Sequence, residues 1–124
     1  MIAMKRMLVL LAVLAVAVTA HAHDPDRGKN GGRQVDAGRY HVELVAKDRS
    51  VAVYISDEQE VPIDASGFKA TGIFVVGGKP LRIEIKHETA NKLSGPSTVV
   101  LPADLKGAVQ IMLPGGGTVQ ARFE

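Results

Sequence analysis

Residues 40–56 read YHVELVAKDRSVAVYIS, two runs in which apolar and polar side chains mostly alternate. A period of two is typical of a β-strand with one face against a core. Asp48 and Arg49 interrupt the pattern, and the alternation resumes directly after them. The stretch therefore predicts a β-hairpin that turns at Asp48 and Arg49.

Similar short runs follow along the rest of the chain, and glycine or proline separates most of them. Val35 begins a short strand before the hairpin, and Gly77 with Gly78 permits a tight turn between two later runs. The sequence predicts an all-β fold, an antiparallel immunoglobulin-like sandwich of seven to nine short strands. The later runs that we interpret as extended are residues 61–63, 68–76, 81–85, 97–101, 107–113 and 118–123.

The amino-terminal residues have the pattern of a secretory signal peptide. Lys5 and Arg6 precede an apolar run over residues 7–18, and small residues stand at Ala20 and Ala22. The run is shorter than the roughly 20 residues that cross a bilayer. We expect a signal peptide over residues 1–22, a flexible polar arm over 23–33 and a β-sandwich domain over 34–124. Cleavage after Ala20 and cleavage after Ala22 both remain open.

Removal of the signal peptide leaves 13 basic and 13 acidic residues, because Lys5 and Arg6 leave with it. A neutral chain with interleaved charges lacks the basic face that nucleic acids require. The chain has no cysteine, which excludes disulfides, thiolate ligands and thiol nucleophiles. We expect a monomer in the periplasm that has no membrane anchor after cleavage.

Histidine is the natural candidate ligand for a metal ion. Cleavage after Ala22 makes His23 the amino terminus, where its amine and ring can chelate Cu(II) or Ni(II), and Asp24 adds a nearby oxygen. His41 and Glu43 project from one face of a strand, about 7 Å apart. That pair either contributes to a site for Cu(II), Ni(II) or Zn(II) or belongs to a solvated face. No cofactor is required by either interpretation.

We expect no enzymatic activity. The serines do not lie in the strand-turn-helix pattern of a nucleophile elbow. The glycine runs lie at turns between predicted strands, and a phosphate-binding loop would need a helix to follow them.

Two stretches carry a resemblance to a known family. Residues 31–45, GGRQVDAGRYHVELV, followed by 53–57, VYISD, resemble small periplasmic proteins of proteobacteria. Those proteins are similar to a domain that lies near, or is fused to, periplasmic adaptor subunits of heavy-metal efflux systems of the resistance-nodulation-division type. Residues 77–79 and 115–123 look like the closing hairpins of that family.

The resemblance implies His41, Glu43 and Glu58 as the metal-ligand positions. Family members often have histidine where this chain has Asn30 and Glu58. We therefore expect an exported non-enzymatic protein that assists heavy-metal handling, by weak metal binding or by contact with an efflux adaptor. The alternative is a metal-independent protein-interaction module of the cell envelope, which adds a partner strand at a sheet edge near residues 61–63 or 99–101.

Overall fold

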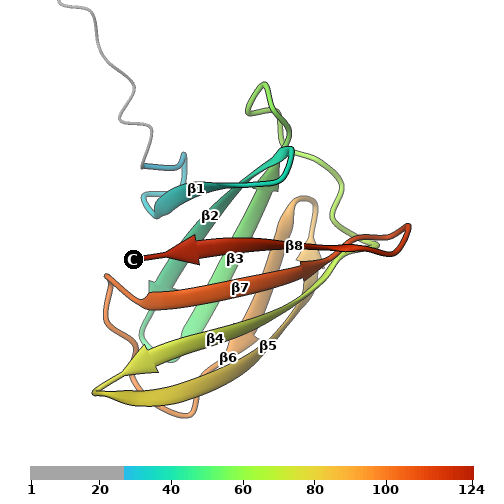
Figure 1. Ribbon diagram of the computed structural model, residues 1–124. Coiled ribbons are helices and arrows are strands. Elements are labelled where there is room, and N and C mark those ends of the chain that lie inside the picture. Colours follow the sequence, from blue (N-terminus) through green and yellow to red (C-terminus); the bar gives the residue numbers. More distant parts are fainter. Residues whose placement is uncertain (1–26) are drawn as a thin grey trace, which may run out of the picture.

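The computed structural model describes residues 27–124, which form eight β-strands and no helix (Figure 1). The predicted signal peptide and the first residues of the predicted arm lie outside this range. The strands are β1 Arg33–Ala37, β2 Tyr40–Lys47, β3 Ser50–Ser56, β4 Lys69–Val76, β5 Lys79–Thr89, β6 Lys92–Pro96, β7 Lys106–Met112 and β8 Thr118–Phe123.

All eight strands belong to one antiparallel sheet in the order β1-β2-β3-β6-β5-β4-β7-β8. The sheet curls until β1 and β8 lie beside each other, so that its two halves face one another as the layers of a sandwich do (Figure 1). No backbone ladder joins β1 to β8 in the described residues. The prediction of an all-β antiparallel fold with seven to nine short strands is confirmed, and the sheet is continuous and nearly closed.

One side chain bridges the open seam between β1 and β8. The Arg33 guanidinium donates hydrogen bonds to the carbonyl oxygens of Leu105 and Glu124, and its carbon lies 5.7 Å from the centre of the Phe123 ring. A cation over an aromatic face is attracted by the ring quadrupole. Arg33 therefore holds the first and last strands together where the ladder is absent.

The core lies between the facing halves of the sheet and is almost wholly aliphatic and aromatic. The inward residues of the central hairpin, Val42, Val51, Val53 and Ile55, have no measurable exposure. The β2–β3 hairpin has the predicted two-residue turn, since Lys47 pairs with Ser50. The predicted turn at Gly77 and Gly78 is also present, and both glycines have positive φ. The other buried apolar side chains are Ala37, Leu44, Ala65, Phe68, Ala70, Phe74, Ile83, Ile85, Leu93, Leu101, Leu105, Val109, Ile111, Ala121 and Phe123.

The predicted strand at residues 97–101 is wrong, because the sixth strand is Lys92–Pro96. Leu93 and Gly95 pair with Val53 and Val51 of β3. Cross-strand pairing overrides the strand propensity of the β-branched residues that follow. A Cβ on Gly95 would lie 2.2 Å from the Glu84 carbonyl oxygen, so this glycine allows β5 and β6 to approach.

The two sheet edges proposed for strand addition are also wrong. Residues 61–63 form only an isolated bridge between Pro62 and Ser56, and residues 99–101 lie in a loop. The edges of the sheet are β1 and β8.

Candidate functional site

A turn over residues 28–32 covers the outward face of β2, and the side chain of Glu43 lies beneath it. The Glu43 carboxylate accepts hydrogen bonds from the Asn30 backbone N–H at 3.0 Å, the Asn30 Nδ2 at 3.0 Å and the Gly32 N–H at 2.8 Å. Its exposed fraction is 4%. A buried carboxylate needs such donors to replace water.

Glycine at position 28 is required for this packing, because a Cβ there would lie 2.1 Å from the Glu43 Cδ. The turn closes on itself through a bond from the Gly28 N–H to the Gly32 carbonyl. Residues 27–33 of the predicted flexible arm are therefore held against the sheet. The rest of the predicted arm lies outside the described residues.

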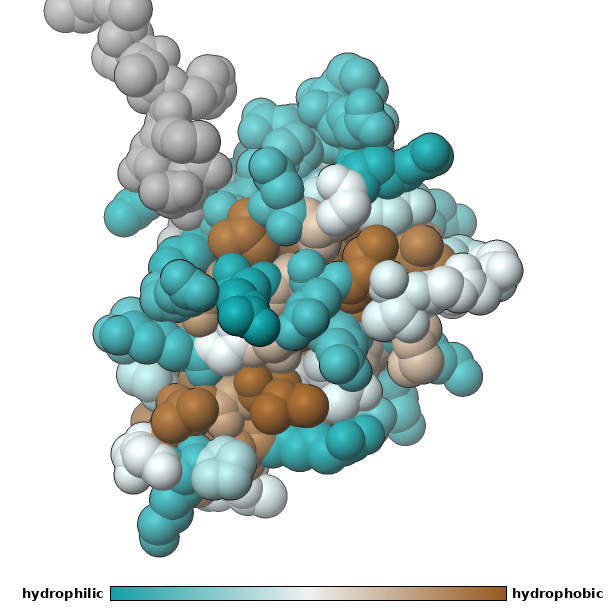
Figure 2. Space-filling model, in the orientation of Figure 1, coloured by the Kyte–Doolittle hydropathy of each residue, from teal (hydrophilic) through white to brown (hydrophobic). Residues whose placement is uncertain are grey.

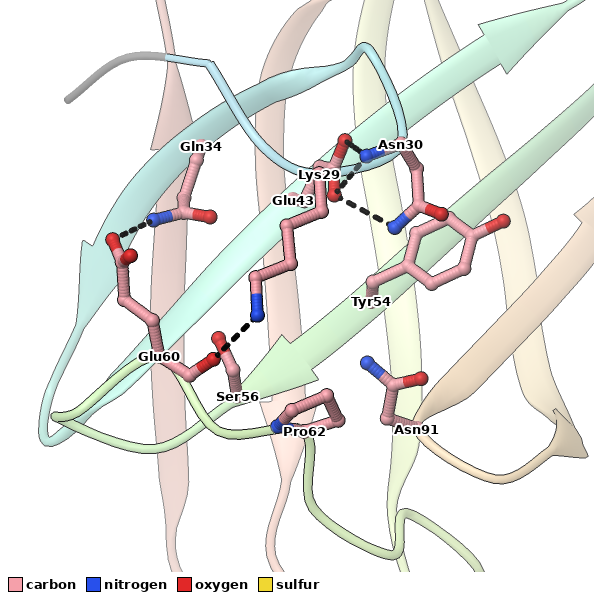
Figure 3. A pocket seen from close by; sticks show the side chains of 9 residues that line it. All are labelled: Lys29, Asn30, Gln34, Glu43, Tyr54, Ser56, Glu60, Pro62 and Asn91. Atoms are coloured by element: carbon pink, nitrogen blue, oxygen red, sulfur yellow. Dashed lines mark hydrogen bonds between the residues drawn. The ribbon is translucent and has the colours of Figure 1, made fainter. Parts of the chain in front are cut away.

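Beside Glu43 the turn, β3 and two loops enclose a pocket of about 210 Å³ (Figure 3). Lys29 extends along one side and donates a hydrogen bond from its Nζ to the Glu60 carbonyl at 3.2 Å. The Gln34 amide donates to the Glu60 carboxylate at 3.1 Å. The groups that close this pocket are thus mostly bonded to one another. Its lining residues are Lys29, Asn30, Gln34, Glu43, Tyr54, Ser56, Glu60, Pro62 and Asn91.

His41 stands at the other end of the same outward face, close to the β1–β2 turn. Its Nδ1 lies 2.8 Å from the Asp36 Oδ1, and its Nε2 lies 3.4 Å from the backbone oxygen of Glu58. The pairing of β1 with β2 places Asp36 directly opposite His41. When the Nδ1 proton is donated to Asp36, the Nε2 lone pair faces the Glu58 oxygen, and a cation between them would satisfy both.

The structure brings together two of the predicted ligand positions, His41 and Glu58. Glu43 has different partners, because its carboxylate oxygens accept hydrogen bonds from the turn over residues 28–32. The expectation that Glu43 belongs to a solvated face is therefore wrong, because the side chain is 4% exposed. The prediction that Glu43 is a metal ligand stays a prediction. The other two candidates, His23 and Asp24, lie outside the described residues.

Sequence reasoning missed Asp36 as a partner of His41. The signal is present, because a two-residue turn at Gly38 and Arg39 pairs Ala37 with Tyr40 and then Asp36 with His41. Carboxylates that orient a histidine ring in this way are common around metal-binding histidines. In residues 27–124 no group of three or more His, Cys, Asp or Glu side chains is arranged to hold a metal ion.

His87, the other histidine in the described range, differs from His41. Its Nε2 lies 3.1 Å from the Ala90 carbonyl, and within the residues that the structure describes no carboxylate forms an ion pair with it. It is half-buried near the end of β5, as expected for a histidine over the edge of the core.

Tyr54 occupies the middle of the outward face of β3, and the Lys92 Nζ lies 5.9 Å from its ring centre. Lys92 also lies 3.3 Å from the Glu88 carboxylate. Hydrogen bonding from Ser94, and then from Lys92, holds the pKa of Glu88 below its usual value. The same contact with Glu88 raises the pKa of Lys92.

Comparison with known protein families, curated proteins and solved structures finds no significant match for this chain. The resemblance to efflux-associated periplasmic proteins therefore stays a prediction. Within residues 27–124 there is no helical segment of the length and hydrophobicity needed to cross a membrane.

Proposed function

We propose that this is an exported, non-enzymatic periplasmic protein that assists heavy-metal handling by weak, exchangeable binding of Cu(II), Ni(II) or Zn(II). His41 is the principal ligand within the described domain, Glu58 supplies oxygen atoms, and Asp36 orients the imidazole. The amino-terminal His23 and Asp24 form a second candidate site. The signal-peptide pattern and the efflux-associated resemblance support this proposal from the sequence.

The observation that carries the proposal is the contact between Asp36 and His41. A carboxylate 2.8 Å from Nδ1 fixes the ring and favours the tautomer in which Nε2 is free to bind a cation. The His41 side chain is 24% exposed, so an ion can reach it from solvent. One nitrogen and the oxygens of Glu58 are fewer ligands than a structural zinc site uses, so water completes the coordination and affinity is low.

Calorimetric titration of the processed protein with each ion tests this site. We expect dissociation constants on the order of 100 μM, which correspond to about 5.5 kcal/mol of binding free energy. His41→Ala should remove the heat of this site, and Asp36→Asn should weaken it.

His87→Ala is the matched control, since His87 has the same ring but forms no ion pair with a carboxylate of the described residues. Equal loss in both histidine variants, or no heat beyond that of the amino-terminal histidine, would show that His41 is not a site.

A second candidate function, a metal-independent interaction module of the envelope, is favoured by a different observation. Two large apolar side chains on the outward face of β4, Ile73 and Val75, are exposed to solvent.

A further inference from the structure

The second half of strand β4 is apolar on both of its faces. Residues 73–76 read IFVV, whereas a strand with one face in the core and one in water alternates apolar with polar. Phe74 is fully buried in the core, and its neighbours Ile73 and Val75 point outward with exposed fractions of 43% and 56%. A strand that is apolar on both faces is expected to be covered on both.

The residues opposite Ile73 and Val75 extend the apolar surface, because directly paired antiparallel residues point to the same face. Ile73 pairs with Ala108 of β7, and Val75 pairs with Pro80 of β5. We call these four residues the β4 patch. Figure 2 shows hydrophobic side chains exposed over β4 and surrounded by hydrophilic ones.

Basic side chains border the β4 patch. Arg82 pairs with Ile73, Lys106 pairs with Val75, and Arg122 pairs with Ala108. Arg82 forms an ion pair with Glu84, in which the Arg82 Nε lies 3.3 Å from the Glu84 Oε1. In the described part of the chain Lys106 and Arg122 have no ion-pair partner. The border therefore favours a negatively charged partner.

A shallow hollow of about 320 Å³ adjoins the patch and is lined by Ile73, Gly107, Ala108, Arg122, Phe123 and Glu124. Gly107 has no side chain to fill it, and a Cβ there would lie 2.2 Å from the Ile73 carbonyl oxygen. The hollow has room for one aliphatic side chain. Interfaces typically combine such an apolar centre with a polar border.

We propose that the β4 patch docks an acidic segment of another protein, with an aliphatic side chain of that segment in the hollow. The proposal rests on the second candidate function, and it names the chemistry of the partner. A second copy of this chain would bring a like-charged border against Arg82, Lys106 and Arg122, which opposes self-association. The patch lacks the tryptophan and tyrosine that anchor proteins at membrane surfaces.

Chemical-shift mapping of the ¹⁵N-labelled processed protein tests the proposal, with EDTA present so that no metal contributes. The probes are two synthetic peptides, one with leucines flanked by glutamates and one with lysines in place of the glutamates. We expect the acidic peptide alone to shift resonances of the β4 patch. Arg122→Glu should weaken this binding on the order of tenfold and admit the basic peptide.

Ile73→Thr should also remove the binding. Met112→Thr is the matched control, because Met112 is 43% exposed on the same sheet face but lies outside the patch. Binding of both peptides alike, shifts located elsewhere, or preference for anionic phosphatidylglycerol vesicles would overturn the proposal. Concentration-dependent self-association through this face would do so as well. None of these outcomes bears on the titration of His41, so the two proposals fail separately.

Discussion

The outward faces of β2 and β4 belong to one sheet, yet the first is covered at Glu43 and the second is open at Ile73 and Val75. On β2 the outward Glu43 is 4% exposed, because the chain's own turn over residues 28–32 lies on it. On β4 the outward Ile73 is 43% exposed, and no described segment of the chain covers it. The polar residue is thus buried and the apolar one is accessible. Exposure on this sheet depends on which segment is near enough to cover a face.

The outward faces of β2 and β4 differ in the kind of group that they present to solvent. The covered face of β2 consists of hydrogen-bonded polar groups, and its uncovered end presents His41 with Asp36. The open face of β4 presents an apolar centre with a basic border. We therefore expect small ions at the first face and a protein partner at the second.

The largest expected effect comes from comparing two isoleucine substitutions, one in the core on β5 and one on the outward face of β4. The comparison tests whether the outward face of β4 is exposed to solvent. Ile83→Thr, inside the core on β5, should lower the free energy of unfolding by about 2–5 kcal/mol. Ile73→Thr should change it by about 0.5 kcal/mol or less, because threonine keeps the β-branch and Ile73 is already 43% exposed. Urea denaturation of both variants measures the difference. Comparable losses would mean that the β4 face is packed against something in the free protein.

Removal of the buried carboxylate tests the closure of the β2 face. Glu43→Ala should cost about 1–3 kcal/mol, because the Asn30 and Gly32 donors lose their acceptor. Hydrogen exchange at residues 28–32 should accelerate at the same time. Glu84→Ala is the control, an outward glutamate on β5 that is exposed and should have almost no effect. If Glu43→Ala is as mild as this control, the turn is not held by the carboxylate.

A smaller effect concerns acid stability where the end of β5 meets β6. The pKa of Glu88 is lower in the folded protein, so its contacts with Ser94 and Lys92 stabilise the fold above the unfolded value of 4.5. That contribution should be lost as the pH falls below this value and through the folded pKa. Glu88→Gln should remove this part of the pH dependence, as measured by urea unfolding between neutral and acidic pH. An unchanged acid profile would rule out the contribution.

Much of the fold follows from alternation along the sequence. The hairpin at residues 40–56 and the one-sided strand around Ile83 were predictable, because each has a single apolar face and a turn of suitable composition. Strand β6 was not, since it has one large apolar residue, Leu93, and is defined by pairing with β3 and β5. Long-range pairing of this kind leaves no local pattern.

The candidate site was predictable only in part. His41 and Glu58 were named from the sequence, and the structure places the His41 ring 3.4 Å from the backbone oxygen of Glu58. The burial of Glu43 was not foreseen, because alternation places it on the outward face and cannot show that residues 28–32 return to cover it. The glycines at 28 and 32 were the available signal, since both allow close approach of the backbone to β2.

The most direct test of the account is an NMR titration with Cu(II), whose paramagnetism broadens nearby resonances. It should use the variant His21→Ala/His23→Ala, because cleavage after Ala20 leaves His21 at the amino terminus and cleavage after Ala22 leaves His23 there, and either would compete for the ion. We predict that broadening is strongest at Asp36, His41 and Glu58 and is weak at the β4 patch. Broadening centred on His87, or no selective broadening at Cu(II) concentrations that saturate weak sites, would contradict the account.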